Sequence, residues 1–380
     1  GGALTPEYIQ QAPMPITSIA WWDKQTDEWA IVILDKTGEI KAGIQDGREI
    51  IPVKRENDLI DVFLSRMEAI QPDILVGYNS DYFDIPYIYY RIKNRLGERT
   101  AKRLSPIRIV EERDKRWYPD QPIRIAGVTS LDYMRLHKKY SFQQEPSMKL
   151  DFLGEKYVGQ KKIEYDGSLD RLFAEDKQKF IEYNFVDVLI LKKLDEKFKY
   201  LDLTKNISHK GKTLYEDVYQ SSKTQDGAIS AYLLNEGIIP PNKDPNPIIK
   251  KNYAGGYLFC PKTGIFNYMF DEDLTSLYPS IIMSLNIGRE TLIGRIVTTD
   301  DRDNRLALND LKEMDQNKEF EIENLKRQVK VMTVKEIISL IEEHNLAITA
   351  NGTMFRTDKP STLSVVLAKW FDERVEYKNA

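Results

Sequence analysis

A proline-rich segment at residues 237–247, GIIPPNKDPNP, divides the sequence into two parts. Four of its eleven residues are proline. Proline fixes φ, lacks an N–H donor and restricts the residue before it, so this segment can form neither a regular helix nor the interior of a sheet. We therefore expect a chain of 380 residues to fold as at least two units, with a boundary here.

Before this boundary, short apolar segments rich in β-branched residues alternate with segments whose apolar residues recur at helical spacing. This alternation predicts an α/β fold built in layers. We expect a hairpin over residues 16–34, strands near 74–78 and 123–133, and helices near 57–71, 84–96, 147–158 and 176–200.

After the boundary, residues 253–282 are expected to be β-rich at first and then helical. Residues 300–330 carry many charges of both signs and few apolar residues, which favours a solvated helical excursion over a binding surface.

The net charge of −4 argues against a protein that coats nucleic acid by bulk charge. Two stretches, 91–116 and 192–212, are nevertheless basic, and each fits either a phosphate backbone or a solvated helix face. Cys260 is the single cysteine, and the three histidines are scattered, so neither a disulfide framework nor a Cys/His zinc site is expected. We expect a reducing, intracellular location, with no signal peptide and no membrane span.

Two carboxylates stand out because each lies beside an apolar segment. Asp84, in VGYNSDYFDIPY, follows a predicted strand and begins a predicted helix, a position where open α/β sheets bind ligands; helix capping is the alternative. Tyr183 and Asp187 are four residues apart and project from one helix face. The apolar neighbours of Asp187 predict either a bound divalent cation or a side chain that reaches solvent at the helix edge. Together, Asp84 and Asp187 suit metal-assisted phosphodiester hydrolysis.

Four motifs follow one another along the chain: NSDYFD at 79–84, YNFVD at 183–187, YAGG at 253–256 and DLTSLYPSII at 273–282. With these motifs the chain resembles the family B DNA polymerases, most closely the replicative polymerases of myovirus-type tailed phages. The resemblance covers about residues 15–295 and 351–380. It implies an RNase H-like 3′→5′ exonuclease domain that lacks its first strand, followed by the N-terminal part of a polymerase palm.

The resemblance also implies roles for single residues of the exonuclease. Asp84 and Asp187 would hold metal ions, and Tyr183 would position the attacking water. Asn79 and Phe83 would contact DNA.

In the palm, Asp273 would bind both catalytic metal ions, and the backbone carbonyl of Leu274 would bind one of them. Ser276 and Leu277 would offer backbone N–H groups to the incoming triphosphate. Tyr278 would exclude a 2′-hydroxyl group by its bulk.

Further expectations concern ligands and partners. The motif between the two sites would contact the template strand through Tyr253, Gly255 and Gly256. The full enzyme would use two Mg²⁺ or Mn²⁺ ions in each active site and would bind primer-template, single-stranded DNA and dNTPs. A sliding clamp is the expected protein partner, a membrane is not, and the expected location is the cytoplasm, that of the host cell for a phage-encoded protein.

By the same resemblance, the exonuclease domain would span residues 1–199, a connecting segment 200–245, the N-terminal palm 246–367 and the start of the fingers 368–380. The first exonuclease motif, Asp-x-Glu, is missing, as are the later fingers and palm motifs. We therefore expect a polymerase fragment that is inactive alone, whether an incomplete gene, an engineered piece or half of a split enzyme. A stand-alone 3′→5′ exonuclease and a catalytically silent DNA-binding or assembly protein remain as alternatives.

Overall fold

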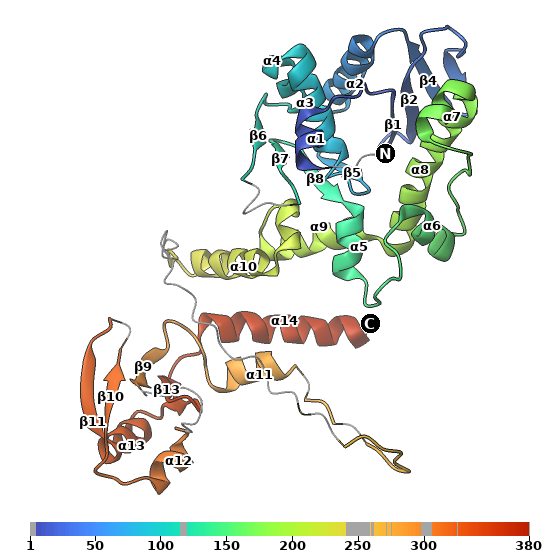
Figure 1. Cartoon of the computed structure of the whole chain (residues 1–380). Coiled ribbons are helices and arrows are strands. Elements are labelled where there is room, and N and C mark those ends of the chain that lie inside the picture. Colours follow the sequence, from blue (N-terminus) through green and yellow to red (C-terminus); the bar gives the residue numbers. More distant parts are fainter. Residues whose placement is uncertain are drawn as a thin grey trace. The chain divides into compact units, whose positions relative to one another are not determined.

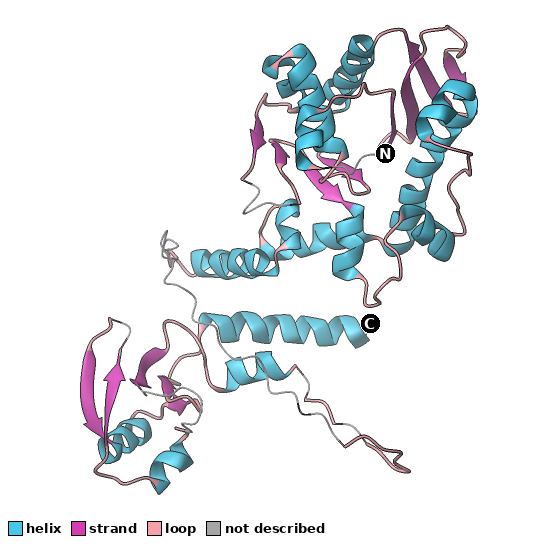
Figure 2. Cartoon of the chain, in the orientation of Figure 1, coloured by secondary structure: helices cyan, strands magenta, loops and turns pink. Residues whose placement is uncertain are grey.

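The structure is a computed structural model that describes residues 5–114, 120–240, 259, 262–270, 272–274, 276–297, 306–324 and 326–379. The chain forms two compact units, Gly1–Thr224 and Gln225–Ala380, whose elements are labelled in Figure 1. Both units mix helices and strands, which confirms the α/β class (Figure 2). The domain boundaries expected after residues 199, 245 and 367 remain predictions. Among the described helices, none has the length and apolar character that a membrane span needs.

The elements of the first unit follow the expected order of strands and helices. Its strands are β1 (Ser18–Asp23), β2 (Glu28–Leu34), β3 (Gly43–Gln45), β4 (Arg48–Val53), β5 (Ile74–Gly77), β6 (Val110–Glu112), β7 (Ile123–Ile125) and β8 (Thr129–Asp132). Its α-helices are α1 (Pro6–Gln11), α2 (Glu56–Ile70), α3 (Asp84–Leu96), α4 (Glu98–Ala101), α5 (Tyr133–Tyr140), α6 (Leu150–Val158), α7 (Leu169–Glu175), α8 (Lys177–Phe198) and α9 (Tyr200–Gly211), with 3-10 turns at Lys102–Leu104 and Tyr215–Tyr219.

The first four strands of this unit form one sheet in the order β1-β2-β4-β3. The expected hairpin is confirmed, since β1 pairs antiparallel with β2. A second, unforeseen hairpin joins β3 to β4 through Asp46 and Gly47, which have φ values of 50° and 76°. An Asp-Gly pair in the left-handed region is the usual signal of such a tight turn. Strand β4 runs parallel to β2, and apolar residues of α2 pack against both strands.

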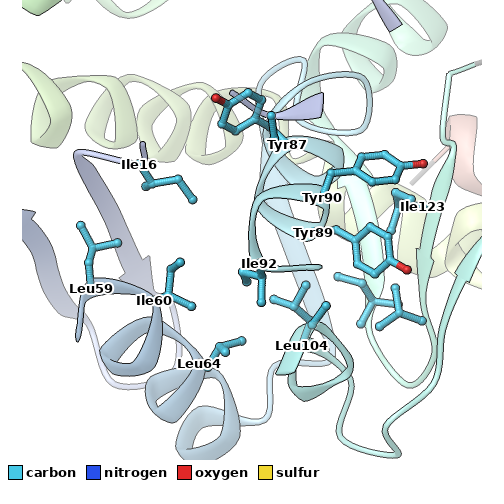
Figure 3. Packing of buried hydrophobic residues seen from close by; sticks show 14 of the residues in the cluster. Ile16, Leu59, Ile60, Leu64, Tyr87, Tyr89, Tyr90, Ile92, Leu104 and Ile123 are labelled. Carbon is cyan, nitrogen blue, oxygen red and sulfur yellow. The ribbon is translucent and has the colours of Figure 1, made fainter. Parts of the chain in front are cut away.

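The main apolar core of the first unit lies between the sheet, α2 and α3 (Figure 3). Leu59, Ile60 and Leu64 on α2 are fully or almost fully buried, and so is Ile92 on α3. With Met67, which is also buried, Ile60 and Leu64 have the four- and three-residue spacing of an amphipathic helix. Packing of this kind fixes α3, whose first residue is Asp84.

Helix α8 joins two further apolar clusters. Phe180, Ile181 and Phe185 pack with isoleucines of β2 and β4, whereas Ile190 and Leu194 pack with residues of β8, α5 and α6. The helix is also tied to the sheet by the ion pair between Arg48 and Glu182, whose atoms Nη1 and Oε2 are 2.7 Å apart. Both ends of α8 are therefore packed against the rest of the unit. This packing fixes the middle of the helix, which carries Tyr183 and Asp187.

The second unit contains a five-stranded sheet in the order β11-β10-β9-β13-β12. Its strands are β9 (Leu292–Val297), β10 (Glu319–Glu323), β11 (Val329–Thr333), β12 (Ala347–Ile348) and β13 (Thr353–Phe355). Its helices are α11 (Leu277–Ser284), α12 (Leu308–Glu313), α13 (Val334–Glu343) and α14 (Thr362–Asn379), and α10 (Ser221–Asn235) crosses the division between the units.

One expectation for this unit was wrong, and a second holds only for its helical end, α11, while residues 253–258, 260 and 261 of its β-rich part lie outside the described residues. In the described part of residues 300–330, a short α12 is followed by the β10–β11 hairpin and not by a longer helix. The reason lies in EFEIE, where Phe320 and Ile322 alternate with charged residues, so that one face of the strand packs on the core formed by α13. Of the segment expected to be β-rich, residues 262–270 contain no strand.

Candidate functional site

The first candidate site begins where β5 and β8 end. These two strands are parallel and pair Gly77 with Asp132, so the residues that follow each strand meet at one edge. Asp132 is buried, and its Oδ1 atom accepts hydrogen bonds from the backbone N–H groups of Asn79 at 3.0 Å and Met134 at 2.9 Å. A Cβ atom on Gly77 would lie 2.4 Å from the Cβ atom of Ser80, so glycine permits this tight turn. Asp132 thus fixes the turn that leads to Asp84.

Asp84 is the first residue of α3, and Phe83 takes the N-cap position, which weighs against a capping role for Asp84. Lost hydration raises the pKa of the Asp84 carboxyl, and the charges of Asp132 and Asp187 raise it further. Because Asp84 keeps an exposed surface, water limits this rise. The influence of Asp187 on Asp84 shows that the two predicted carboxylates belong to one electrostatic environment.

Asp187 and Tyr183 lie on the same face of α8, as their spacing predicted, and both contact Lys162. The Nζ atom of Lys162 is 2.7 Å from Oδ2 of Asp187 and 3.1 Å from the hydroxyl oxygen of Tyr183. The Asp187 side chain is only 29% exposed. This weighs against the alternative that its carboxylate reaches solvent at the helix edge. Its second oxygen, Oδ1, is buried and accepts no hydrogen bond. One oxygen of Asp187 is therefore held by a cation, and the other is available to a ligand.

Burial and charge act together on the Asp187–Lys162 pair. Burial raises the pKa of the Asp187 carboxyl, Asp151 adds to the rise, and Lys162 opposes it. The pKa of Lys162 is raised as well: burial alone would lower it, but the Asp187 carboxylate outweighs burial. The ion pair thus keeps Lys162 charged, while burial makes the Asp187 carboxylate costly to ionise without a cation beside it.

The donor set fits Mg²⁺ or Mn²⁺, because both ions prefer carboxylate oxygens and Asp187 Oδ1 is an unused one. Within the described residues, however, no group of three or more His, Cys, Asp or Glu side chains is arranged to hold a metal ion. Asp84 and Asp187 form a pair and not a complete set of ligands. Beside them, a cleft of about 520 Å³ is lined by Lys162, Tyr183 and Asp151 among others.

The second candidate site lies in the second unit, at the start of α11. Asp273 is exposed, and Tyr278 is 77% exposed, so neither serves the apolar core. Ser276 has a left-handed φ of 52° and occupies the N-cap position of α11. The Nη1 atom of Arg374, on α14, lies 3.2 Å from Oγ of Ser276. A guanidinium group thus stands beside the first N–H groups of α11, where anions bind readily.

The remaining predicted residues have simpler positions. Leu274 and Leu277 are exposed, at 68% and 41%. Phe83 is half-buried, and its ring lies against that of Tyr87 with 5.5 Å between centroids and a tilt of 36°, so it also packs on the core. The expectations for Tyr253, Gly255 and Gly256 lie outside the described residues.

Three residues of the sites were missed at the level of sequence: Lys162, Asp132 and Arg374. Lys162 lies 25 positions before its partner Asp187, and Arg374 lies 98 positions after Ser276. Nothing in the local sequence marks such lysine and arginine partners. The sequence did contain a signal for Asp132. It lies at the end of a predicted strand, and Asp84 also follows the end of a predicted strand, so both positions are expected at the edge of the sheet where ligands bind.

Comparison with known proteins identifies the class to which both sites belong. The model described as "DNA polymerase family B, exonuclease domain" matches residues 5–153, and the model described as "DNA polymerase family B" matches residues 213–380. The chain belongs to DNA polymerase family B.

Its similar relatives include two phage enzymes. The chain is 29% identical over 394 residues to the DNA-directed DNA polymerase of Escherichia phage RB69, with 97% of the chain and 40% of the relative covered. It is 33% identical over 282 residues to the DNA-directed DNA polymerase of Enterobacteria phage T4, with 73% of the chain and 31% of the relative covered. A DNA polymerase of Thermococcus litoralis is 25% identical over 263 residues. The chain therefore spans less than half the length of these relatives, and the expected resemblance to phage polymerases is confirmed.

Proposed function

We propose that this chain supplies the proofreading 3′→5′ exonuclease and the N-terminal part of the palm of a DNA-directed DNA polymerase. The observation that carries the proposal is the Lys162–Asp187–Tyr183 cluster, with a buried, unused carboxylate oxygen, in the electrostatic reach of Asp84. The match of residues 5–153 to the exonuclease domain supports an RNase H-like fold for the first unit. DNA, with a free 3′ end, is the proposed substrate.

In the exonuclease, Asp84 and Asp187 would hold Mg²⁺ or Mn²⁺, which when bound supplies an activated water and neutralises charge on the leaving oxygen. Lys162 keeps Asp187 and Tyr183 in place through its two hydrogen bonds. The Tyr183 hydroxyl group accepts from Lys162 and can donate its own proton to the oxygen of the attacking water. Asn79 and Phe83, in the turn before α3, would contact the DNA strand.

Two ions across one phosphodiester require more ligands than a pair of carboxylates. Because the described residues bring together only such a pair, we propose that the 380-residue chain alone cleaves DNA weakly or not at all. Further carboxylates would complete the site in the whole protein. The 213–380 match supports this view over a stand-alone exonuclease, which would have no use for a palm.

In the palm, the proposal assigns metal binding to Asp273 and to the carbonyl of Leu274. The backbone N–H groups of Ser276 and Leu277, together with Arg374, would bind the triphosphate of a dNTP. Tyr278 would restrict the sugar to deoxyribose. Two Mg²⁺ or Mn²⁺ ions per site, a sliding clamp as partner of the whole protein and a cytoplasmic location, in the host for a phage-encoded protein, are parts of the same proposal.

A cleavage assay with single-stranded DNA labelled near its 5′ end tests the exonuclease proposal in a longer protein that contains residues 1–380. With Mn²⁺, the wild-type protein should shorten the strand from its 3′ end. Asp84→Asn and Asp187→Asn should each reduce the rate by at least about a hundredfold, because each removes a metal ligand but keeps the shape of the side chain.

The matched control is Asp58→Asn. Asp58 lies on α2, and its exposed carboxylate pairs with Arg55. This variant should cleave at the wild-type rate. Cleavage that survives both Asp84→Asn and Asp187→Asn would contradict the proposed site. In parallel, binding of Mn²⁺ followed by calorimetry should weaken in the same two variants of the 380-residue chain, whether or not that chain cleaves DNA.

A further inference from the structure

The turn at residues 78–83, between β5 and α3, is held by an ion pair in the interior of the first unit. The acid of this pair is Asp81, whose side chain is only 1% exposed. One oxygen of the Asp81 carboxylate, Oδ1, accepts a hydrogen bond from the hydroxyl group of Ser130 on β8. The other oxygen, Oδ2, lies 2.9 Å from Nη1 of Arg135 on α5. Both oxygens of Asp81 thus have partners, and the turn is joined to β8 and to α5.

Arg135 is itself held by an aromatic ring. Its guanidinium carbon lies 3.9 Å from the ring centroid of Tyr219, at the end of the 3-10 turn Tyr215–Tyr219, well within the range of a cation–π contact. The hydroxyl group of Tyr219 donates to the backbone carbonyl of Asp132 at 3.2 Å, which ties the ring to the end of β8. A second carboxylate, that of Asp120, is 3.9 Å from Arg135 but 68% exposed, so water screens its charge. Tyr219 therefore determines where the guanidinium group lies.

The turn needs this support because of its backbone conformation. Asn79 has a left-handed φ of 59°, which a residue with a side chain adopts only where other contacts hold it. The Asp132 carboxylate supplies one such contact, since it accepts the backbone N–H of Asn79 at 3.0 Å and that of Asp81 at 3.4 Å. The Asp81–Arg135 pair supplies another, from the side chain.

The position of the turn is passed on to α3 through the backbone. The N–H of Phe83 donates to the carbonyl of Asn79 at 3.1 Å, and the N–H of Ile85 donates to the carbonyl of Ser80 at 3.0 Å. These bonds join the residues before and after Asp84 to the turn. A shift of the turn would therefore displace Asp84.

Stability alone does not explain the Asp81–Arg135 pair. Burial raises the pKa of the Asp81 carboxyl to about 6, and the charge of Asp132 raises it further, whereas Ser130 and Arg135 lower it. A buried ion pair of this kind is often no more stabilising than apolar side chains of similar volume. Its charged hydrogen bonds, in contrast, have a definite direction. The pair is therefore better suited to fix the position of the turn than to stabilise the fold.

We propose that Arg135 is a positioning residue of the exonuclease. Oriented by Tyr219, it holds Asp81, and through the turn it sets the Asp84 carboxylate where that carboxylate can bind a divalent cation. Arg135 itself touches neither the metal ion nor the DNA in this role. The inference rests on the proposed function, because the position of Asp84 matters in this way only if Asp84 is a metal ligand.

Calorimetry of Mn²⁺ binding to the 380-residue chain tests this role without cleavage. Arg135→Met should weaken binding by roughly tenfold, because residues that orient a metal ligand contribute about that much to affinity. The matched control is Lys177→Met, which removes the cation that lies 2.8 Å from another buried carboxylate, that of Asp35. It should lower the thermal unfolding midpoint, as Arg135→Met does, but should bind Mn²⁺ like wild type.

The double variant Asp81→Asn/Arg135→Met separates position from stability. It leaves no buried carboxylate at residue 81, so it should regain most of the thermal midpoint that Arg135→Met loses. It should not regain the affinity for Mn²⁺, because the contact that orients the turn is still missing. Tyr219→Leu removes the ring and neither charge, and it should weaken Mn²⁺ binding by about threefold or more. If Arg135→Met does not fold, these two variants carry the test.

Cleavage by the longer protein that contains residues 1–380 gives an independent readout. Arg135→Met should need roughly ten times more Mn²⁺ than wild type for half of its maximal rate, and its KM for single-stranded DNA should be unchanged. Excess Mn²⁺ should therefore restore the rate. A residue that only stabilised the fold would leave this dependence on Mn²⁺ as it is in wild type.

The outcomes separate the two proposals. If Asp84→Asn weakens Mn²⁺ binding but Arg135→Met does not, Arg135 is not a positioning residue and the proposed function stands. The same conclusion follows if Lys177→Met weakens binding as much as Arg135→Met, or if the double variant regains affinity together with stability. If neither Asp84→Asn nor Asp187→Asn weakens Mn²⁺ binding, the proposed function fails and the role of Arg135 fails with it.

Discussion

Replacement of Arg91 by Met tests how the fold holds the helix that begins with Asp84. Arg91 lies on α3 and forms a two-pronged ion pair with Glu56 on α2, with Nε to Oε1 at 2.8 Å and Nη2 to Oε2 at 2.7 Å. Its Nη1 atom also donates to the carbonyl oxygens of Ala12 and Pro13 at 2.9 and 3.0 Å. One side chain thus ties α2, α3 and the segment after α1 together.

The expected cost follows from burial. The side chains of Arg91 and Glu56 are each 9% exposed, so Arg91→Met leaves a carboxylate that is almost fully shielded from water. Its nearest remaining cation is Arg95, whose Nε atom is 3.9 Å from Oε2 and makes a longer contact than Arg91 does. Removal of one partner from such a pair costs about 3–5 kcal/mol in free energy of unfolding. The double variant Arg91→Met/Glu56→Met should cost less than Arg91→Met alone, because it leaves no uncompensated charge.

The matched control is Arg171→Met, which breaks the pair with Glu175 on α7, where both side chains are about 60% exposed. It should change the free energy by less than about 1 kcal/mol. Urea unfolding, followed by the fluorescence of the tryptophans of β1 and β2, measures all three variants. A decrease below about 1 kcal/mol for Arg91→Met, or a double variant less stable than Arg91→Met, would refute this reasoning.

The same pair gives a pH dependence of known sign. Burial alone would raise the pKa of Glu56, but Arg91 outweighs burial and the pKa is lowered from about 4.5. A carboxyl whose pKa is lowered on folding stabilises the fold above its unfolded pKa, and that stabilisation is lost as pH falls through the folded value. The difference in stability between wild type and Arg91→Met should therefore be full at pH 7 and shrink below about pH 4.5.

Two further predictions concern the first site, and a third concerns the stability of the second unit. Lys162→Met should tighten Mn²⁺ binding to the 380-residue chain by roughly tenfold in calorimetry, because it removes a charged hydrogen bond from an oxygen of Asp187; unchanged or weaker binding would be contrary evidence. Mn²⁺ binding should strengthen as pH rises and release protons, since the pKa values of Asp84 and Asp187 are both raised and each must ionise to bind; comparison of heats in two buffers measures that release. Asn286→Ala should destabilise the second unit by about 2–4 kcal/mol, because it removes hydrogen bonds to two carbonyl groups and to the buried N–H of Ser361, and hydrogen exchange of α14 should report the change.

Local patterns sufficed to predict much of the first unit. The apolar spacing of α2 and α8 and the alternation of β1 and β2 are set by neighbours in the sequence, so the elements could be placed without knowledge of the fold. Asp84 and Asp187 could be singled out for a similar reason, because each lies in an apolar local context that a carboxylate rarely occupies without a function.

Long-range partners could not be predicted in this way. The pairing of Lys162 with Asp187 and of Arg374 with Ser276 depends on how whole elements pack, and lysine and arginine are common on any surface. The β10–β11 hairpin was missed for another reason: its high charge masked the alternation of Phe320 and Ile322, which a search for a period of two residues would have found.

The most direct test of the central claim is the rate at which 5′-labelled single-stranded DNA is shortened by a longer protein containing residues 1–380, compared with Asp187→Asn and Asp58→Asn in the same protein. The account predicts shortening from the 3′ end that requires Mn²⁺ or Mg²⁺, is nearly abolished by Asp187→Asn and is unaffected by Asp58→Asn. Shortening at the wild-type rate by Asp187→Asn would contradict it.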